Sequence, residues 1–225
     1  MGVQISSSKY ILLEVIMWLW YIFYKKVIKV IKNIILDIGG VICDDGYRNL
    51  SKVLNIREEQ GKEIAQIAYG GDFKKCLLGK LDINTHIKIL KENHPELADK
   101  IEYVLNPQNY KETFPVMNNT LDVILKLKKE GYKIYILSNI TKESFEYFKN
   151  VIKFEKYFDG GAYSFQEVMI KPNHEFYEVL IKKYDLAKEE CIFFDDKQKN
   201  VEAGNRIGIK SIKFKTIEDI KKNLM

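Results

Sequence analysis

The sequence predicts an α/β fold in which a parallel β-sheet lies between two layers of helices. Short apolar runs alternate with longer stretches that carry apolar residues at helical spacing, as is typical of strand–helix–strand units. Several apolar runs end in an acid or a short polar residue, and ligands of such sheets bind beyond the carboxyl ends of the strands. A chain of 225 residues is long enough for one principal domain with a smaller inserted one.

Four apolar runs are expected to form strands of this sheet. The first, residues 34–36, leads into Asp37 and ends at the turn that Gly39 and Gly40 predict. Between the first strand and the others, residues 48–110 carry helical patterns and no convincing strand. The later strands are expected over 133–137, 191–194 and 210–214, and the helices that separate them over 121–129, 142–150, 175–183 and 200–206.

The distribution of charge argues against a nucleic-acid partner. The chain carries a net charge of +5, and residues 1–32 hold +4 of it, which leaves the remainder nearly neutral. A protein that binds a phosphate backbone needs a basic face on its folded body. The three cysteines, Cys43, Cys76 and Cys191, have no zinc-site spacing and fit a reducing, intracellular compartment. Cys43 and Cys191 lie in apolar runs and are expected to be buried.

The N-terminal segment has an apolar run over residues 10–24, interrupted only by Glu14 and followed by Lys25 and Lys26. The run is shorter than the roughly 20 residues of a membrane span, although residues 10–31 together approach that length. Three interpretations stay open. The segment is a membrane anchor or interfacial helix, or it is a helix packed on the domain or a partner, or the assigned translation start lies upstream of the true one. The lysines favour a cytoplasmic catalytic domain, with membrane contact through residues 10–31 if the first interpretation holds.

Two strand ends carry groups suited to phosphoryl transfer, which needs a nucleophile, a divalent cation and fixed donors. Asp37 can attack phosphorus with one oxygen and bind Mg²⁺ with the other, or it can simply cap a turn. Ser138 and Asn139 follow the second strand, where a hydroxyl and backbone N–H groups can hold an anion. An ordinary helix N-cap at Ser138 or Thr141 is the alternative.

Two later motifs supply a cation and further acids. Lys171 precedes Pro172, which is expected in the first turn of a helix, and a lysine there can reach a phosphate. Asp195 and Asp196 end a buried strand, with Asn200 shortly after. Two adjacent carboxylates repel each other without a cation, so Mg²⁺ binding is favoured over a purely structural role.

The four motifs together, in this order and at strand ends, resemble those of the haloacid dehalogenase-like (HAD) superfamily. The similar sequence motifs are Asp-Ile-Gly-Gly-Val, Leu-Ser-Asn, Lys-Pro and Phe-Phe-Asp-Asp, and the resemblance covers about residues 33–214. Within the superfamily the chain looks like the branch of small sugar-phosphate phosphatases and the phosphatase domain of soluble epoxide hydrolases.

The resemblance implies a Rossmann-like three-layer core with an inserted all-helical cap. The core would comprise residues 33–44 and 114–225, the cap residues 45–113, and residues 1–32 a separate hydrophobic and basic segment. The activity implied is Mg²⁺-dependent hydrolysis of a small phosphorylated metabolite, a sugar phosphate among the candidates, through an aspartyl-phosphate intermediate.

The resemblance also assigns roles to individual residues. Asp37 and Lys171 would be catalytic, and the substrate phosphate would be bound by Ser138, Asn139 and Lys171. Mg²⁺ would be bound by Asp37, the backbone carbonyl of Gly39, and Asp196. Asp195 and Asn200 would lie behind these ligands or reach the metal through water.

The sequence departs from the family pattern at Gly39, where most members carry a second Asp that protonates the leaving group. General acid catalysis is worth about 10²–10⁴-fold, and a leaving group of low pKa needs it least. Asp44 or Asp45 could substitute, although a turn is the simpler use of both. A weakly active or non-catalytic binding protein is therefore the alternative function. A dehalogenase needs no Mg²⁺, and the Asp195–Asp196 pair argues against it.

Overall fold

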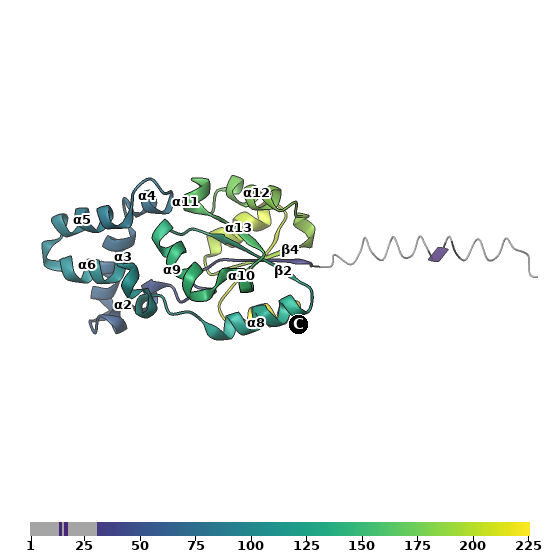
Figure 1. The fold of residues 1–225 in the computed structure, drawn as a ribbon, viewed down its shortest axis with the longest axis horizontal. Coiled ribbons are helices and arrows are strands. Elements are labelled where there is room, and N and C mark those ends of the chain that lie inside the picture. The colour runs from purple at the N-terminus through teal and green to yellow at the C-terminus, as the bar shows by residue number, and fades with distance from the viewer. Residues whose placement is uncertain (1–13, 15, 18–30) are drawn as a thin grey trace, which may run out of the picture. The chain divides into compact units, whose positions relative to one another are not determined.

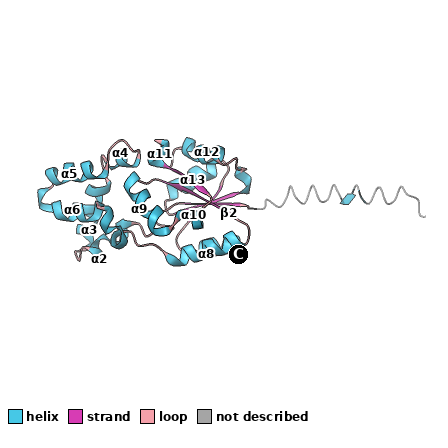
Figure 2. Ribbon diagram, viewed as in Figure 1, coloured by secondary structure: helices cyan, strands magenta, loops and turns pink. Residues whose placement is uncertain are grey.

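The computed structural model describes residue 14, residues 16–17 and residues 31–225 (Figures 1 and 2). Membrane contact was expected through residues 10–31, which lie almost entirely outside this described part. Within it, no helix combines the length and the apolar character that crossing a membrane requires. The features below all belong to the compact unit Lys32–Met225.

A five-stranded sheet forms the centre of the core, and every neighbouring pair of strands is parallel. The strand order is β3-β2-β1-β4-β5, so the first strand of the chain lies in the middle. This confirms the predicted fold class. The strands are β1 (Asn33–Leu36), β2 (Lys133–Ser138), β3 (Gly160–Tyr163), β4 (Cys191–Asp195) and β5 (Lys210–Lys213).

Strand β3 was not predicted, because Gly160, Gly161 and an alanine have little preference for strands. Packing against Tyr184 explains their presence. A Cβ atom on Gly160 would lie 2.4 Å from ring atoms of Tyr184. The Tyr184 hydroxyl also accepts a hydrogen bond from the Gly161 N–H at 2.8 Å and lies 3.2 Å from the Gly161 carbonyl oxygen. The strand thus forms through a tertiary contact that is distant in sequence.

Helices cover both faces of the sheet, with α12 and α13 on one side and α8 on the other (Figure 1). Apolar residues of the sheet and of α12 and α13, among them Ile35, Phe176 and Phe193, form a buried cluster. The helices of the core are α8 (Asn118–Lys129), α9 (Lys142–Ile152), α10 (Phe154–Tyr157), α11 (Ser164–Glu167), α12 (His174–Lys183), α13 (Gln198–Arg206) and α14 (Ile217–Leu224).

One helix start differs from the expectation. Pro172 was expected in the first turn of a helix, but α12 begins at His174, and its N-cap is Asn173, whose side chain accepts a hydrogen bond from the Glu175 N–H. The prediction was wrong because an asparagine cap, which satisfies a free N–H group, determines the helix start here. Pro172 instead follows a cis peptide bond in the preceding turn.

Residues 45–113, for which we keep the name helical cap, contain helices and no strand, as the pattern predicted. They have a hydrophobic cluster of their own, which includes Leu50, Ile64 and Ile101. Their exact boundaries as a domain stay a prediction. The helices are α2 (Gly46–Val53), α3 (Glu58–Tyr69), α4 (Phe73–Leu77), α5 (Ile83–Asn93), α6 (Ala98–Leu105) and α7 (Tyr110–Thr113).

Two short segments join the helical cap to the core, and we call residues 42–44 and 115–117 the paired linkers. The Asp44 N–H donates to the Pro115 carbonyl oxygen at 2.9 Å, and the Met117 N–H donates to the Ile42 carbonyl oxygen at 2.8 Å. An antiparallel bridge between Cys43 and Val116 lies between these bonds. The two connections are therefore held side by side as one short ribbon.

Candidate active site

Three carboxyl groups converge at the carboxyl ends of β1, the central strand of the sheet, and of its neighbour β4. Asp37 follows β1, Asp195 ends β4, and Asp196 comes next. Each offers an oxygen, and these three atoms lie within 4.8 Å of one another. All three residues are less than 9% exposed. Because buried carboxylates this close repel one another strongly, the group needs cations nearby.

Lys171 supplies one of these cations. Its ammonium group lies 2.8 Å from Asp37 Oδ2 and 2.7 Å from Asp195 Oδ2, and it donates to the Leu137 carbonyl oxygen at 2.7 Å. The side chain is fully buried. An ammonium group has three N–H donors, so these contacts account for all of them. Lys171 therefore holds the two carboxylates in place, and the phosphate contact expected of it stays a prediction.

The two carboxyl groups that share Lys171 have opposite pKa shifts. Burial raises the pKa of Asp37 to about 6, against the opposing effect of the Lys171 charge. Burial acts in the same direction on Asp195, but there Lys171, the Lys197 N–H and Asn200 outweigh it and lower the pKa. Burial also raises the pKa of Asp196. For Lys171 the two carboxylates overcome the effect of burial, so its pKa is raised and it stays charged.

Ser138 and Asn139 lie at the end of β2, as expected, but their present partners are protein groups. The Ser138 hydroxyl donates to Asp37 Oδ1 at 2.8 Å, and the Ile38 N–H donates to the same oxygen at 2.7 Å. The Asn139 amide accepts from the Lys171 N–H at 2.7 Å and donates to the Lys171 carbonyl oxygen at 3.0 Å. Asn139 thus positions the Lys171 backbone. The N-cap of α9 is Thr141.

Asn200 contacts the carboxyl group of Asp195, and the role that the family resemblance implies for it stays a prediction. Its Nδ2 is 3.0 Å from each oxygen of Asp195, and the Lys197 N–H donates to Asp195 Oδ1 at 2.8 Å. The other amide atom, Asn200 Oδ1, is buried and makes no hydrogen bond to any described residue. An orphaned buried oxygen beside carboxylates is a site that water or a cation can satisfy.

The two glycines after Asp37 serve different purposes. Gly40 has φ +76°, and a Cβ atom there would lie 2.5 Å from Asp196 Cγ. Any side chain at Gly40 would therefore displace the Asp196 carboxyl group. At Gly39 a Cβ atom would meet no atom within 4 Å, and the residue lines a cavity. The position that could carry a general acid is thus open space.

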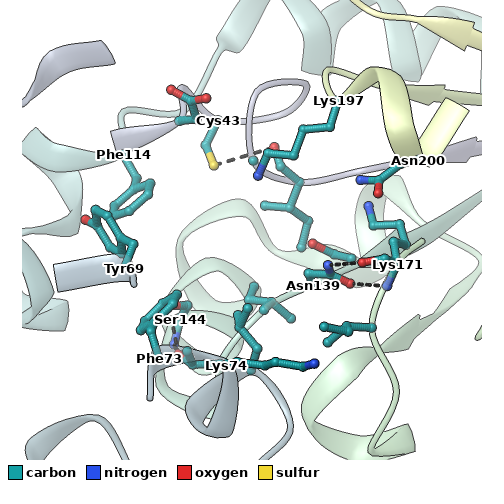
Figure 3. Close-up of a pocket in the computed structure, with 18 of the residues that line it drawn as sticks. Cys43, Tyr69, Phe73, Lys74, Phe114, Asn139, Ser144, Lys171, Lys197 and Asn200 are labelled. Carbon is teal, nitrogen blue, oxygen red and sulfur yellow. Dashed lines mark hydrogen bonds between the residues drawn. The ribbon is translucent and has the colours of Figure 1, made fainter. Parts of the chain in front are cut away.

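The cavity has a volume of about 700 Å³ and is lined by both the core and the helical cap. Figure 3 shows Lys171, Asn139 and Asn200 at one end, and Tyr69 and Phe114 at the other. Several lining residues were not predicted, because no local motif marks them. They are Tyr69, Phe73, Lys74 and Leu77 of the helical cap, and Phe114, Phe148, Ile170, Lys197 and Lys199 of the core. Asp45 also lines the cavity.

Two curated relatives are phosphatases. A D-ribitol-5-phosphate phosphatase from Bacteroides thetaiotaomicron is 26% identical over 194 residues, which cover 80% of this chain and 90% of that enzyme. A sesquiterpene phosphatase from Aspergillus oryzae is 36% identical over 87 residues, which cover 39% of this chain. The chain therefore spans less than half (44%) of the latter enzyme's length.

Solved structures share the fold. A HAD family enzyme from Bacteroides thetaiotaomicron, in complex with magnesium and inorganic phosphate, has a TM-score of 0.65 at 22% identity and covers 87% of this chain and all of that one. An L-2-haloacid dehalogenase from Xanthobacter autotrophicus has a TM-score of 0.60 at 14% identity, covering 87% and 82%. The model of the haloacid dehalogenase-like hydrolases matches residues 31–208. This chain therefore belongs to the haloacid dehalogenase-like hydrolase family.

Proposed function

We propose that this chain is a Mg²⁺-dependent phosphatase that hydrolyses a small phosphorylated metabolite through an aspartyl-phosphate on Asp37. The observation that carries the proposal is the group of Asp37, Asp195 and Asp196 beside the buried Lys171, which itself lines one end of a cavity. The named activities of the two relatives, both phosphatases, support the same reaction class.

The donor set fits Mg²⁺, which prefers carboxylate and carbonyl oxygens. Asp37 and Asp196 would bind it together with the Gly39 carbonyl, and the buried Asn200 Oδ1 is a further oxygen near this group. The absence of a side chain at Gly40 leaves the space that the Asp196 carboxyl group occupies. When bound, the cation would neutralise charge on the phosphate and on the carboxylates.

The residues of the chain can carry out both halves of the reaction. Asp37 attacks phosphorus, so that a bond forms to its carboxyl oxygen while the ester P–O bond breaks, and its electrons leave with the alkoxide oxygen, which takes a proton from water. Ser138 and the Ile38 N–H hold the carboxyl group in place through Oδ1. Water then attacks the phosphorus of the aspartyl-phosphate, which releases phosphate and restores Asp37. Lys197 and Lys199, exposed at the cavity, would attract the anionic substrate.

Binding of Mg²⁺ should release protons at low pH. A carboxyl group with a pKa of about 6 is mostly protonated at pH 5 and ionised at pH 8, and the metal binds the ionised form. We therefore expect release of about one proton from Asp37 per Mg²⁺ at pH 5 and almost none at pH 8. Calorimetric titrations in two buffers of different ionisation enthalpy measure this number. Equal proton release at both pH values would contradict the assignment of Asp37 as a ligand.

Gly39 determines which leaving groups the enzyme can release without help. We expect Gly39→Asp to accelerate hydrolysis of alkyl phosphates by about 10²-fold, because it supplies a proton donor in open space. For p-nitrophenyl phosphate, whose leaving group needs no proton, the rate should change little. Gly39→Asn is the matched control, since it has the same size and no acidic proton. An equal effect of both variants on both substrates would contradict this role.

The same measurement separates the two candidate functions. Gly39 is the observation that favours a weakly active or non-catalytic binding protein. The non-catalytic form of that alternative predicts Mg²⁺ binding without release of phosphate from any ester, p-nitrophenyl phosphate included. Turnover of this activated ester by the unaltered chain would exclude a purely binding role.

A further inference from the structure

The cavity has two ends of different chemistry, and the end distant from the carboxylates is aromatic. It consists of Tyr69, Phe73 and Phe114, which we call the aromatic wall, and the Tyr69 ring contacts each of the other two edge to face. The Tyr69 ring centroid lies 5.2 Å from that of Phe73 and 6.2 Å from that of Phe114. All three side chains are half-buried, so part of each ring faces open space. Leu77, Phe148 and Ile170 add further apolar surface to the lining.

The hydroxyl groups around the cavity are already engaged in hydrogen bonds within the protein. Thr141 donates to Ser144 Oγ at 3.0 Å, and Ser144 donates to the Tyr110 hydroxyl at 3.2 Å. The Tyr69 hydroxyl lies 3.4 Å from the Val104 carbonyl oxygen, inside the helical cap. Tyr69 therefore presents its ring to the cavity, while its polar end is occupied elsewhere.

The side-chain amide of Asn139 is also engaged within the protein, since its Nδ2 and Oδ1 atoms both hydrogen-bond the Lys171 backbone. A polyol substrate would bury several hydroxyl groups, and each one left without a partner weakens binding. Beyond Asp45, the lysines and Asn200 Oδ1, which lies at the carboxylate end, the cavity offers such a substrate few side-chain partners. The lysines Lys74, Lys197 and Lys199 are exposed cations and suit a phosphate better than a neutral hydroxyl.

We propose that the aromatic wall binds the alcohol part of the substrate, and that this part is a hydrocarbon rather than a polyol. This inference rests on the proposed phosphatase activity. The substrate class is then the phosphate monoester of an apolar alcohol. Its phosphate lies at the carboxylates and its hydrocarbon part lies between the helical cap and the core. A cavity of about 700 Å³ is ample for such a molecule.

A series of n-alkyl phosphates from ethyl to hexyl tests this inference, because the pKa of the leaving alcohol hardly changes along it. We expect kcat/KM to rise about twofold to fourfold per methylene, mainly through a lower KM. Ribitol 5-phosphate and glycerol phosphate should be poorer substrates than hexyl phosphate. A kcat/KM that does not change with chain length, or a higher kcat/KM for the polyol phosphates, would overturn the inference.

The variant Phe73→Ala assigns the effect to the aromatic wall. We expect the ratio of kcat/KM for hexyl over ethyl phosphate to fall by about tenfold. Tyr157→Ala is the matched control, since Tyr157 is a half-buried aromatic residue outside the cavity lining. If the Phe73→Ala protein folds and its ratio of kcat/KM for hexyl over ethyl phosphate is unchanged, the aromatic wall does not bind the hydrocarbon part. The chain-length series on the unaltered chain decides the matter if this variant fails to fold.

The outcomes distinguish failure of this inference from failure of the proposed function. The enzyme could hydrolyse p-nitrophenyl phosphate and ribitol 5-phosphate while kcat/KM stays constant along the n-alkyl phosphates. That result would support the phosphatase activity and contradict the inference that the substrate is apolar. Release of phosphate from no ester at all, p-nitrophenyl phosphate included, would overturn both.

Discussion

Replacing Asp37 by Asn is expected to reduce Mg²⁺-dependent phosphate release by about 10⁴-fold or more. An amide is a poor nucleophile toward phosphorus, and it also loses the negative charge that the metal needs. The geometry adds a third reason. Both oxygens of Asp37 accept from donors, namely Ile38 and Ser138 at Oδ1 and Lys171 at Oδ2, so the NH₂ group of an asparagine would face another donor.

Initial rates of phosphate release from p-nitrophenyl phosphate measure this loss. Asp122→Asn, an exposed aspartate of α8, is the control and should retain full activity. Acid quenching during turnover should trap a phosphorylated protein that hydroxylamine cleaves, and Asp37→Asn should yield none. Turnover by Asp37→Asn within a few fold of the unaltered chain would end the nucleophile assignment.

Replacing Lys171 by Met is expected to cost about 3–5 kcal/mol in the free energy of unfolding when Mg²⁺ is absent. The ammonium group is buried between Asp37 and Asp195, and its removal takes its positive charge away from three neighbouring carboxyl groups. Because Lys171 lowers the pKa of both Asp37 and Asp195, both values should rise in the variant. Less of the nucleophile would then be ionised at neutral pH, so activity should fall as well.

Urea unfolding with a chelator and with millimolar Mg²⁺ tests the stability effect. A bound cation replaces part of the lost charge, so Mg²⁺ should stabilise the Lys171→Met protein more than the unaltered chain. Lys129→Met, at an exposed position in α8, is the control and should stay within about 0.5 kcal/mol. Identical unfolding curves for Lys171→Met and the unaltered chain would show that the buried cation is not needed.

Part of the polar site could be predicted because Asp37, Ser138 and Asp195 each lie at the end of an apolar run. Strand ends in a parallel sheet meet at one edge, so Asp37, Ser138 and Asp195 could be placed together from the sequence. The structure confirms this arrangement. The strand β3 could not be predicted in this way, because its glycines are explained only by the ring of Tyr184.

The aromatic end could not be predicted, because its residues have no common motif. Tyr69 and Phe73 lie in two different helices, and Phe114 follows the last helix of the helical cap. On a helix such residues resemble ordinary core positions, and only the packing of the helical cap over the core brings them to one cavity. The hydrogen bonds that occupy Lys171 and Asn139 were likewise invisible, since they depend on three-dimensional distances between loops.

The paired linkers have a consequence for how this enzyme could change its substrate. Two backbone segments that are bonded to each other behave as a single strip, so any swing of the helical cap on them would be a rotation about one axis. Asp37, Lys171, Asp195 and Asp196 all lie on the far side of that strip, and such a swing would leave their mutual distances unchanged. Tyr69, Phe73 and Leu77 of the cavity lining belong to the helical cap, so part of the selectivity for the alcohol could change without altering the groups that would carry the chemistry.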